Sequence, residues 1–567
     1  MPTVTPTVTL NAYFSGIGAA STDITADVVL GVQPLRGKYG ISGTGPTARV
    51  GRTGTLTFAM NNSASNSAST QGYYTPGHTN ARTTGTVGWN LGLIISVTLS
   101  YGGTNYIKFI GTLTDVKPDA GRYQRQSVRC TVLDWMDEAA RSKLKALPVQ
   151  TSQRSDQLVS TLVTNSVGRQ PIATSYDTGR STFDYALDNL TDNKTTVLKA
   201  LSDVVMSEMG HLYIRGTTDA ASAKGGQLKF ENRTSRLAYG AAEHTFSNDM
   251  VKLDARQSRK DIINHTYVVV HPRTLDTTAS VLWELTSTKV VPSVEAGYTT
   301  TIIAEFSDLI VTGVNFGGSS TTTARGQQVA TTNLTAPSSG TDWVANSASD
   351  GTGSNLTSDV AVTVTTTAAN TATLQIVNSG ATKAYLTTLQ IRGVAIKDQT
   401  PTTVDDANSS SITSYGEQDI RINMPYESDP ELALSIAKWQ NAATDSARFV
   451  VRSMEVAANT SATMMEQALA REPGDKIGID ESMTGLDNDE AWHLGTTGES
   501  ELGETTYLDY DPSSGDFFIQ GVEFTLASGN ILNVKWNLKP ADQSGAWVLG
   551  VVNASELGET TVLSWDI

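Results

Sequence analysis

The segment 109–144, FIGTLTDVKPDAGRYQRQSVRCTVLDWMDEAARSKL, constrains the fold most. Its first residues alternate between apolar and polar, which is the period of a half-buried strand. The residues 117–121, KPDAG, place Pro and Gly where a turn requires them. A second β-rich run follows at 127–133. Asp134 is placed to cap a short helix that Pro148 ends. The pattern predicts two antiparallel strands followed by a packing helix, with no catalytic chemistry.

A chain of 567 residues is too long for one core and implies about three to five domains. Charged residues make up only 17%, while Thr, Ser, Gly and Val are abundant. This balance favours many short strands joined by polar turns over long helices. We therefore expect a mainly β fold with a smaller α+β part.

The first part of the chain predicts one β domain. Residues 1–21 read as an extended polar arm that a neighbouring molecule would order. Residues 22–149 contain half-buried strand patterns, a Ser- and Asn-rich surface loop at 61–85, and a hairpin that turns at Tyr101-Gly102-Gly103. We interpret 22–149 as a first β-barrel or small sandwich.

Residues 150–250 differ, because helical spacing alternates there with short strands. Short helical patterns cover 156–165 and 182–190, and the clearest helix covers 195–209. Thr195 or Thr196 is placed to cap that helix, and Gly210 stands where a left-handed terminator belongs. With the strand patterns HLYIRG and GQLKFENR, this segment predicts a small α+β domain.

A second β-barrel domain is predicted in three pieces, 251–275, 405–490 and 513–545, with a helix at 428–443. Its strand patterns include NHTYVVVHP, FVVRSMEVAAN and the hairpin DFFIQGVEFTLASGNILNVKWNLKP. The pieces are separated because another β-rich segment interrupts them.

That interrupting segment, 276–404, alternates Thr, Val and Ala almost continuously. The alternation is strict at Leu374 and Ile376, and it slips by one residue between Leu386 and Leu389. Period-two alternation is typical of half-buried strands. The pattern predicts a complete β-sandwich inserted into the second domain.

An internal repeat lies near the end of the sequence. WHLGTTGESELGETTYLDY at 492–510 returns as WVLGVVNASELGETTVLSW at 547–565. Two copies are too few for a solenoid. We interpret 491–512 and 546–567 as two strand-and-turn segments that pair with each other, within the chain or between copies.

A formal net charge of −16 argues against tight binding to a nucleic-acid backbone. The single cysteine, Cys130, permits no internal disulfide and lies in a predicted strand, which favours a buried apolar role over a nucleophile. The opening MPTVTPTVTL has no basic or apolar signal region, and no run reaches the roughly 18 apolar residues of a membrane span. We expect a protein made in the cytoplasm with no bilayer segment of its own.

Candidate metal-binding and catalytic residues are few. None of the six histidines has a metal-binding spacing such as HExxH, although His265 and His271 share one face of a predicted strand. We therefore predict no metal ion, no cofactor and no catalytic residue. The histidines, interpreted as ordinary strand or loop residues, are His78, His211, His244, His265, His271 and His493.

Weaker motifs lack what their chemistry needs. Residues 498–502 lack the second glycine of a nucleophile elbow, and Gly16-Ile17-Gly18 does not lie in a βαβ unit. The best calcium-like loop, between Asp509 and Asp516, lacks the terminal bidentate Glu. Neighbouring carboxylates at 405–406 and 487–490 give no specific support for a glycosidase. Aromatic residues that could stack on sugars, but fit a core or interface better, are Tyr73, Tyr74, Trp343 and Trp492.

Several short motifs occur in an informative order along the chain. Those of the first β domain are Arg49-Val50-Gly51, Leu56-Thr57-Phe58 and Phe109-Ile110-Gly111. Those of the α+β domain are the residues 207–213 and 226–230, followed by Arg233. Those of the second half are Met424-Pro425-Tyr426, 474–477 with 484–486, 518–522, and the final 547–550 with 555–558. Together they resemble the tail hub proteins of long-tailed bacteriophages, which form a ring at the tip of the tail tube.

This resemblance implies a structural virion protein at the tail tip. Two hub-type β-barrels per chain, flanking an α+β domain, let a homotrimer present a pseudo-sixfold ring. Such a ring would adapt the sixfold tail tube, or distal tail ring proteins, to a threefold central fibre or spike. Its lumen would line or close the DNA exit channel and meet the tape measure protein, without specific nucleic-acid binding.

Two other functions stay open. A host-receptor or glycan-binding adhesin would use the inserted sandwich, 276–404, for contact with the host surface. A tail-associated hydrolase would need a catalytic constellation, which the motifs above do not supply, so we do not expect an enzyme.

Overall fold

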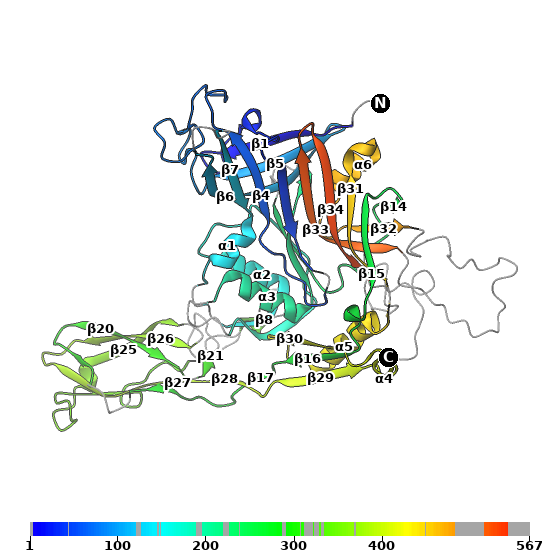
Figure 1. The fold of residues 1–567 in the computed structure, drawn as a ribbon. Helices are drawn as coiled ribbons and strands as arrows, with labels where there is room; N and C mark the ends of the chain where they lie inside the picture. The colour runs from blue at the N-terminus through cyan, green and yellow to red at the C-terminus, as the bar shows by residue number, and fades with distance from the viewer. Residues whose placement is uncertain are drawn as a thin grey trace.

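The structure is a computed structural model. It describes residues 4–43, 45–120, 126–144, 147, 149–188, 195–218, 226–237, 239–285, 291–306, 308–310, 321–322, 328–329, 334–367, 370–447, 449–481 and 515–541. Figure 1 shows an upper body of long strands, helices beneath it, and a narrow arm of strands that extends sideways from the lower end. Within the described residues, no helix is both long enough and apolar enough to cross a membrane.

The first β unit forms one side of the upper body (Figure 1). Its strands are β1 (Thr7–Tyr13), β2 (Thr22–Asp23), β3 (Leu35–Gly40), β4 (Thr55–Asn61), β5 (Ile94–Tyr101), β6 (Thr104–Pro118) and β7 (Ser127–Leu133), with a 3-10 turn at Thr25–Asp27. β1 pairs antiparallel with β5 along its whole length. The expected arm at 1–21 is thus corrected, because burial of Leu10 and Ala12 holds this segment in the sheet of its own chain.

The strand–turn–strand–helix order predicted for 109–144 is present. β6 and β7 are followed by helix α1 (Trp135–Arg141), and the Asp134 carboxylate accepts a hydrogen bond from Met136 N at 3.0 Å. The hairpin between β5 and β6 turns through Gly102 and Gly103, both with positive φ. Cys130 lies buried in β7, as its strand position predicted.

The α+β part lies below the sheet. Its elements are α1, β8 (Gln150–Arg154), α2 (Ser155–Thr164), β9 (Ala173–Tyr176), β10 (Thr182–Ala186), α3 (Val197–Glu208), β11 (His211–Arg215), β12 (Thr217–Thr218) and β13 (Gln227–Glu231). The Thr196 side chain caps α3, but Met209, not Gly210, adopts the left-handed conformation, with φ 58°. The helix predicted at 182–190 is wrong for the described residues, because Thr182–Ala186 pairs with β8 as a strand and buries Phe183.

The second β unit forms the other side of the upper body. Its elements are β14 (Thr245–Ser247), β15 (Lys252–Gln257), β31 (Phe449–Ala457), α6 (Ala462–Ala470), β32 (Lys476–Asp480), β33 (Asp516–Ala527) and β34 (Ile531–Pro540), with a 3-10 turn at Ala458–Thr460. The β33–β34 hairpin turns where the sequence predicted, and Gly529 there has a φ of 80°.

The two β units repeat one strand order. Neighbouring strands run β3-β4-β7-β6-β5 in the first unit and β15-β31-β34-β33-β32 in the second. When the five strands of each unit are numbered in chain order, both units place them side by side in the order first, second, fifth, fourth, third. A register shift also falls at corresponding places, between Leu113 and Asp115 in β6 and between Ile519 and Gly521 in β33. The two β units thus repeat one strand arrangement, although their amino-acid sequences show no matching repeat.

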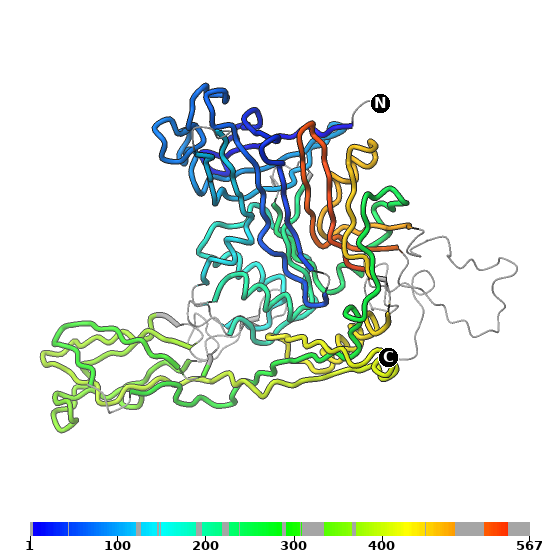
Figure 2. The backbone as a smooth tube through the Cα atoms, viewed as in Figure 1, coloured from blue at the N-terminus to red at the C-terminus, as the bar shows by residue number. Residues whose placement is uncertain are grey.

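The repeated units join into one 14-stranded sheet. The join is antiparallel pairing of β3 with β33, from Leu35 opposite Leu526 to Gly40 opposite Gly521. Figure 2 shows this N-terminal strand beside the C-terminal hairpin. A single hydrophobic cluster continues across the join and contains Phe58 of the first unit and Trp536 of the second.

A separate three-stranded sheet corrects the predicted extent of the second β domain. β16 (His265–Val270) pairs with β29 (Thr402–Ala407) and β30 (Asp419–Met424), outside the large sheet. Helices α4 (Ser409–Tyr415) and α5 (Pro430–Thr444) complete this layer, with a 3-10 turn at Arg259–Asp261. Val268 and Ile422 pack in one cluster with Met209. Residues 261–272 and 402–447 therefore belong with the α+β layer, because their apolar side chains pack onto it.

The arm has a core of its own. Its strands are β17 (Arg273–Leu275), β18 (Ser280–Glu284), β19 (Ser293–Val294), β20 (Thr299–Glu305), β21 (Leu309–Ile310), β22 (Thr321–Thr322), β23 (Gln328–Val329), β24 (Trp343–Asn346), β25 (Val360–Thr367), β26 (Thr371–Asn378), β27 (Ala384–Gly393) and β28 (Ala395–Asp398), with a 3-10 turn at Thr357–Asp359. Leu374, Ile376, Leu386 and Leu389 are all buried between its sheets. The one-residue slip that the sequence shows between Leu386 and Leu389 is a register shift between β24 and β27. Thr388 pairs with Val344, whereas Leu386 pairs with Ala345.

Candidate functional site

The motifs that carry the sequence resemblance meet at the junction between the units. Gly51 N donates to Leu212 O at 2.6 Å, and Leu212 N donates to Arg49 O at 2.9 Å. The Arg49 guanidinium donates to Met209 O at 2.6 Å. The motif after β3 is therefore held on the start of β11, which fixes the first β unit to the α+β part.

A buried carboxylate connects three parts of the chain at this junction. Glu472, which follows α6, forms an ion pair with Lys108 of β6. Its oxygens also accept the Tyr39 hydroxyl at 2.9 and 3.0 Å and Gly216 N at 2.8 Å. Lys108 donates to Leu469 O at 2.9 Å, so the ammonium caps the C-terminal end of α6. Lys108 and Tyr39 belong to the first β unit, Gly216 to the α+β part and Glu472 to the second β unit, so this cluster sets the relative position of all three.

Burial governs the electrostatics of the junction. Burial, and then the charge of Glu472, raise the pKa of the Tyr39 hydroxyl well above its usual range, so it acts as a donor. Burial also raises the pKa of Asp475, although Arg215 opposes the shift from 3.1 Å. The charged groups are paired with one another, Lys108 with Glu472 and Arg215 with Asp475, which is typical of a structural contact.

The motif segment around Gly474 fits the same junction tightly. Gly474 has a φ of 96°, and a Cβ there would lie 2.0 Å from the Tyr213 hydroxyl oxygen. That hydroxyl donates to Glu231 at 2.6 Å. Only glycine allows this close approach of the second β unit to β11.

A second buried carboxylate organises the helical layer. Glu208 at the end of α3 accepts hydrogen bonds from Ser155 Oγ at 2.9 Å and from Ser181 N at 2.8 Å. The next residue back, Ser207, accepts Tyr426 N at 3.0 Å. The motifs 207–213 and 424–426 thus contact each other and join α3 to the loop before α5.

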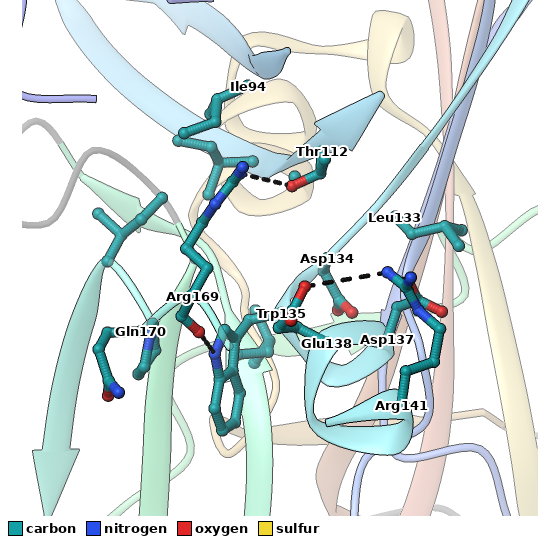
Figure 3. A pocket seen from close by; sticks show the side chains of 16 residues that line it. Ile94, Thr112, Leu133, Asp134, Trp135, Asp137, Glu138, Arg141, Arg169 and Gln170 are labelled. Carbon is teal, nitrogen blue, oxygen red and sulfur yellow. Dashed lines mark hydrogen bonds and ion pairs between the residues drawn. The ribbon is translucent and has the colours of Figure 1, made fainter. Parts of the chain in front are cut away.

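A cavity of about 40 Å³ lies where α1 approaches β6 (Figure 3). The Arg169 guanidinium donates to Thr112 Oγ1 at 2.7 Å, and the Trp135 indole donates to Arg169 O at 2.7 Å. Arg141, which also lines this cavity, forms ion pairs along α1 with Asp137 at 2.5 Å and with Glu138 at 3.9 Å. Substrate pockets commonly hold about 300–1,000 Å³, so this cavity is a packing gap between units.

A wider groove of about 330 Å³ lies beside β1 and the β33–β34 turn. Among the described residues, no charged or histidine side chain lines it, so the described lining offers neither an acid, a base nor a metal ligand. The lining residues are Thr7, Val8, Thr25, Val28, Leu30, Leu35 and Asn530.

The described histidines make structural contacts. His265 of β16 contacts Asp405 through Nε2 at 3.0 Å and Glu417 through Nδ1 at 2.7 Å. These hydrogen bonds raise its pKa, Asp405 contributing most. Because its two nitrogens point in opposite directions, the three residues do not surround one ion.

The other histidines occupy unrelated positions. His211 is buried in β11, where desolvation first, and then Arg236, keep its pKa well below the usual range. His244 stacks edge-on against Phe246, His271 contacts Asn423 at 2.7 Å, and His78 accepts Asn80 N at 3.1 Å. His493 lies outside the described residues.

The remaining sequence candidates are scattered or outside the described residues. Tyr74 and Trp343 are buried, as a core interpretation predicts. The elbow-like 498–502, the acidic 487–490, the loop between Asp509 and Asp516, Trp492, and both repeats, 491–512 and 546–567, lie outside the described residues. Among the described residues, no group of three or more His, Cys, Asp or Glu side chains is placed to hold a metal ion. The junction cluster was missed because Lys108 and Glu472 lie 364 residues apart.

Comparisons with known proteins give structural neighbours only. No family model matches the chain, and no curated protein does. The fold is similar to the tail protein from Neisseria meningitidis MC58, with 8% identity and a TM-score of 0.41, over 94% of this chain and 96% of that chain. It is also similar to the 43 kDa tail protein of prophage MuSo2 from Shewanella oneidensis, with 9% identity and a TM-score of 0.42, over 94% of this chain and 98% of that chain.

A third neighbour comes from E. coli and is a component of the type VI secretion system, described as structurally similar to the T4 bacteriophage tail proteins gp27 and gp5. The identity is 9% and the TM-score 0.35, over 94% of this chain and 76% of that chain. The first two of these neighbours are thus tail proteins, and the third is a secretion-system component described as similar to phage tail proteins.

Proposed function

We propose that this chain is a structural virion protein that forms the trimeric hub at the tip of a phage tail. The observation that carries this proposal is the repeated strand order, β3-β4-β7-β6-β5 and β15-β31-β34-β33-β32, within one sheet. Two equivalent units per chain give six in a trimer, so three copies would form a pseudo-sixfold ring.

The distribution of the parts supports a symmetry adaptor. The β units fill the upper body, whereas the α+β layer and the arm lie at the lower end and occur once per chain (Figure 1). In a trimer, the upper end would offer six similar positions to the tail tube or distal tail ring proteins. The lower end would offer only three, which suits a central fibre or spike.

The junction contacts support the mechanical role. A hub must keep its two β units in fixed relation while load passes along the tail. The Lys108–Glu472 pair and the β3–β33 ladder would provide this, because the pair is buried and the ladder joins the two units directly within one sheet. In this proposal the ring lumen lines or closes the DNA exit channel and meets the tape measure protein. The net charge of −16 favours passage of DNA without specific binding.

We propose no catalytic role. The contacts of the buried carboxylates Glu208 and Glu472 support this, because hydrogen bonds and an ion pair engage them within the fold. The chain would be made in the host cytoplasm and would reside at the tail tip of the virion.

The adhesin alternative is favoured by one specific observation, the projecting arm (Figure 1). It has its own core, and Tyr298 and Ile303 on it are 67% and 65% exposed. Exposed aromatic and apolar side chains of this kind suit contact with a host surface. An arm-deleted chain tests this role: β17 and β28 pair at Leu275 and Ile396, so an Asn-Gly turn can join those two residues.

The experiment that tests the hub is the solution mass by light scattering, followed by negative-stain images. A trimer with a six-lobed ring is expected for both the full chain and the arm-deleted chain. An elongated monomer that binds host cells, and loses binding when the arm is removed, would contradict the hub and favour the adhesin.

A further inference from the structure

Two strand edges of the large sheet lack a neighbouring strand within the described residues. One is on β6 and the other is on β15. In the described residues, β33 is flanked by β34 on one side, and by β32 and then β3 on the other. β6 corresponds to β33 and is likewise flanked by β7 and β5. Beyond Thr112, however, no described strand pairs with the β5 side of β6, where β3 would lie in the second unit.

The strand that would fill this place is the counterpart of β3, which is β15. In the described residues, β15 pairs only with β31 and ends the large sheet. β15 and β6 lie on opposite sides of the upper body (Figure 1), so β15 cannot reach β6 within one chain. A second copy can bring them together.

We propose that β15 of one copy pairs antiparallel with residues Asp115–Lys117 of β6 in the next copy. The contact repeats between chains the β3–β33 pairing that already exists within each chain, and it rests on the proposed hub. Because different surfaces meet, the contact is head-to-tail and must close into a ring. It also covers two sheet edges that would otherwise expose unpaired backbone groups.

Burial limits the register of this pairing. Val116 of β6 and Leu253 and Ala255 of β15 are partly buried against the same hydrophobic cluster. A continuous sheet must keep these side chains on one face, so Val116 lies opposite Ala255 or a residue two positions away.

Charge then selects among these registers. With Val116 opposite Ala255, the exposed Asp115 faces Arg256, and the exposed Lys117 faces Asp254. A shift of two residues in either direction places like charges opposite each other, Arg256 with Lys117 or Asp254 with Asp115. The complementary register is therefore the one we assign.

Cysteine cross-linking of the full chain tests this contact. Asp254→Cys combined with Lys117→Cys should give disulfide-linked dimers and trimers on a denaturing gel after mild oxidation. Asp254→Cys with Asp23→Cys is the matched control, because exposed Asp23 lies on β2 at the other end of the sheet. The native Cys130 is buried and stays in both variants.

Charge exchange gives a second measurement without cysteines. Asp254→Lys alone should raise the dissociation constant of the oligomer about tenfold, and adding Lys117→Asp should restore it. A trimer that neither cross-links through 254 and 117 nor responds to these charges would overturn the strand pairing and leave the hub intact. Linkage through Asp23 would assign the contact to β2 instead. A chain that stays monomeric at every concentration would overturn both proposals.

Discussion

Lys108 and Glu472 form a buried ion pair that joins β6 of the first β unit to the segment after α6 in the second. The side chains are 1% and 7% exposed. Removing one member of such a pair leaves an uncompensated charge in the interior, whereas removing both leaves none.

Lys108→Met should destabilise the chain by about 3–5 kcal/mol, because Glu472 then stays buried without its cation. The double variant Lys108→Met with Glu472→Gln should recover much of this loss. Urea unfolding midpoints measure both. Arg141→Met is the control: Arg141 is 64% exposed in its pair with Asp137, so about 0–1 kcal/mol is expected. Equal losses for the three variants would contradict a special role for the buried pair.

Gly40→Ala should weaken the join between the β units. Gly40 has a φ of 95°, and an added Cβ would lie 2.6 Å from Gln520 O. Gly16→Ala is the matched control, since Gly16 has a φ of 92° but no atom within 4 Å of the added Cβ. We expect Gly40→Ala to destabilise by about 1–3 kcal/mol more than Gly16→Ala, by thermal unfolding. No difference would mean that backbone strain alone matters at Gly40.

Asp134→Asn should change how stability depends on pH. Burial raises the pKa of Asp134 to about 7, whereas an unfolded carboxyl titrates near about 4. The folded chain binds this proton more tightly, so the resulting stability is full below about pH 4 and is lost as pH rises through about 7.

Asparagine still accepts the Met136 N–H but does not ionise. The variant should therefore match the wild type near pH 4 and exceed it by a few kcal/mol, on the order of the pKa difference, at pH 8. Unfolding midpoints from pH 4 to 8 measure this. Asp137→Asn on the same helix should keep the wild-type trend, and a flat wild-type profile would contradict the prediction.

His265 should stabilise its sheet only while it is charged. Its contacts with Asp405, and then Glu417, raise its pKa above the ordinary value near about 6.5. The stabilisation is therefore present below about 6.5 and is lost as pH rises through the raised folded-state pKa. The side-chain NMR titration of His265 measures that pKa directly, and Asp405→Asn should lower it. Because the carboxylates are exposed, His265→Gln should cost below about 1 kcal/mol at pH 6.

Much of the local structure could be predicted from neighbouring residues. Asp134 and Thr196 cap the helices that follow them. The turn at Gly102-Gly103 and the register slip near Leu386 are also where the sequence places them. The caps and the turn depend on contacts within one element or one hairpin, and the slip is visible in the alternation within one strand.

Other features could not be predicted, because their partners lie far away in the sequence. Thr182–Ala186 has helical spacing but pairs as a strand with β8. Thr7–Tyr13 alternates polar and apolar residues as a strand does, but the sequence does not show that its partner is β5 or that Leu10 is buried there. Long-range pairing overrode local preference at Thr182–Ala186 and supplied the partner strand for Thr7–Tyr13.

A mainly β chain with caps, hairpins and an alternating arm follows from side chains a few residues apart. The pairing of β3 with β33 and the contact between Lys108 and Glu472 depend instead on the tertiary fold. Backbone hydrogen-bonding groups along a strand edge are the same for nearly every residue type. The amino-acid sequence therefore does not identify the partner strand. The repeated strand order, and the sheet edges it leaves open, follow from that long-range choice.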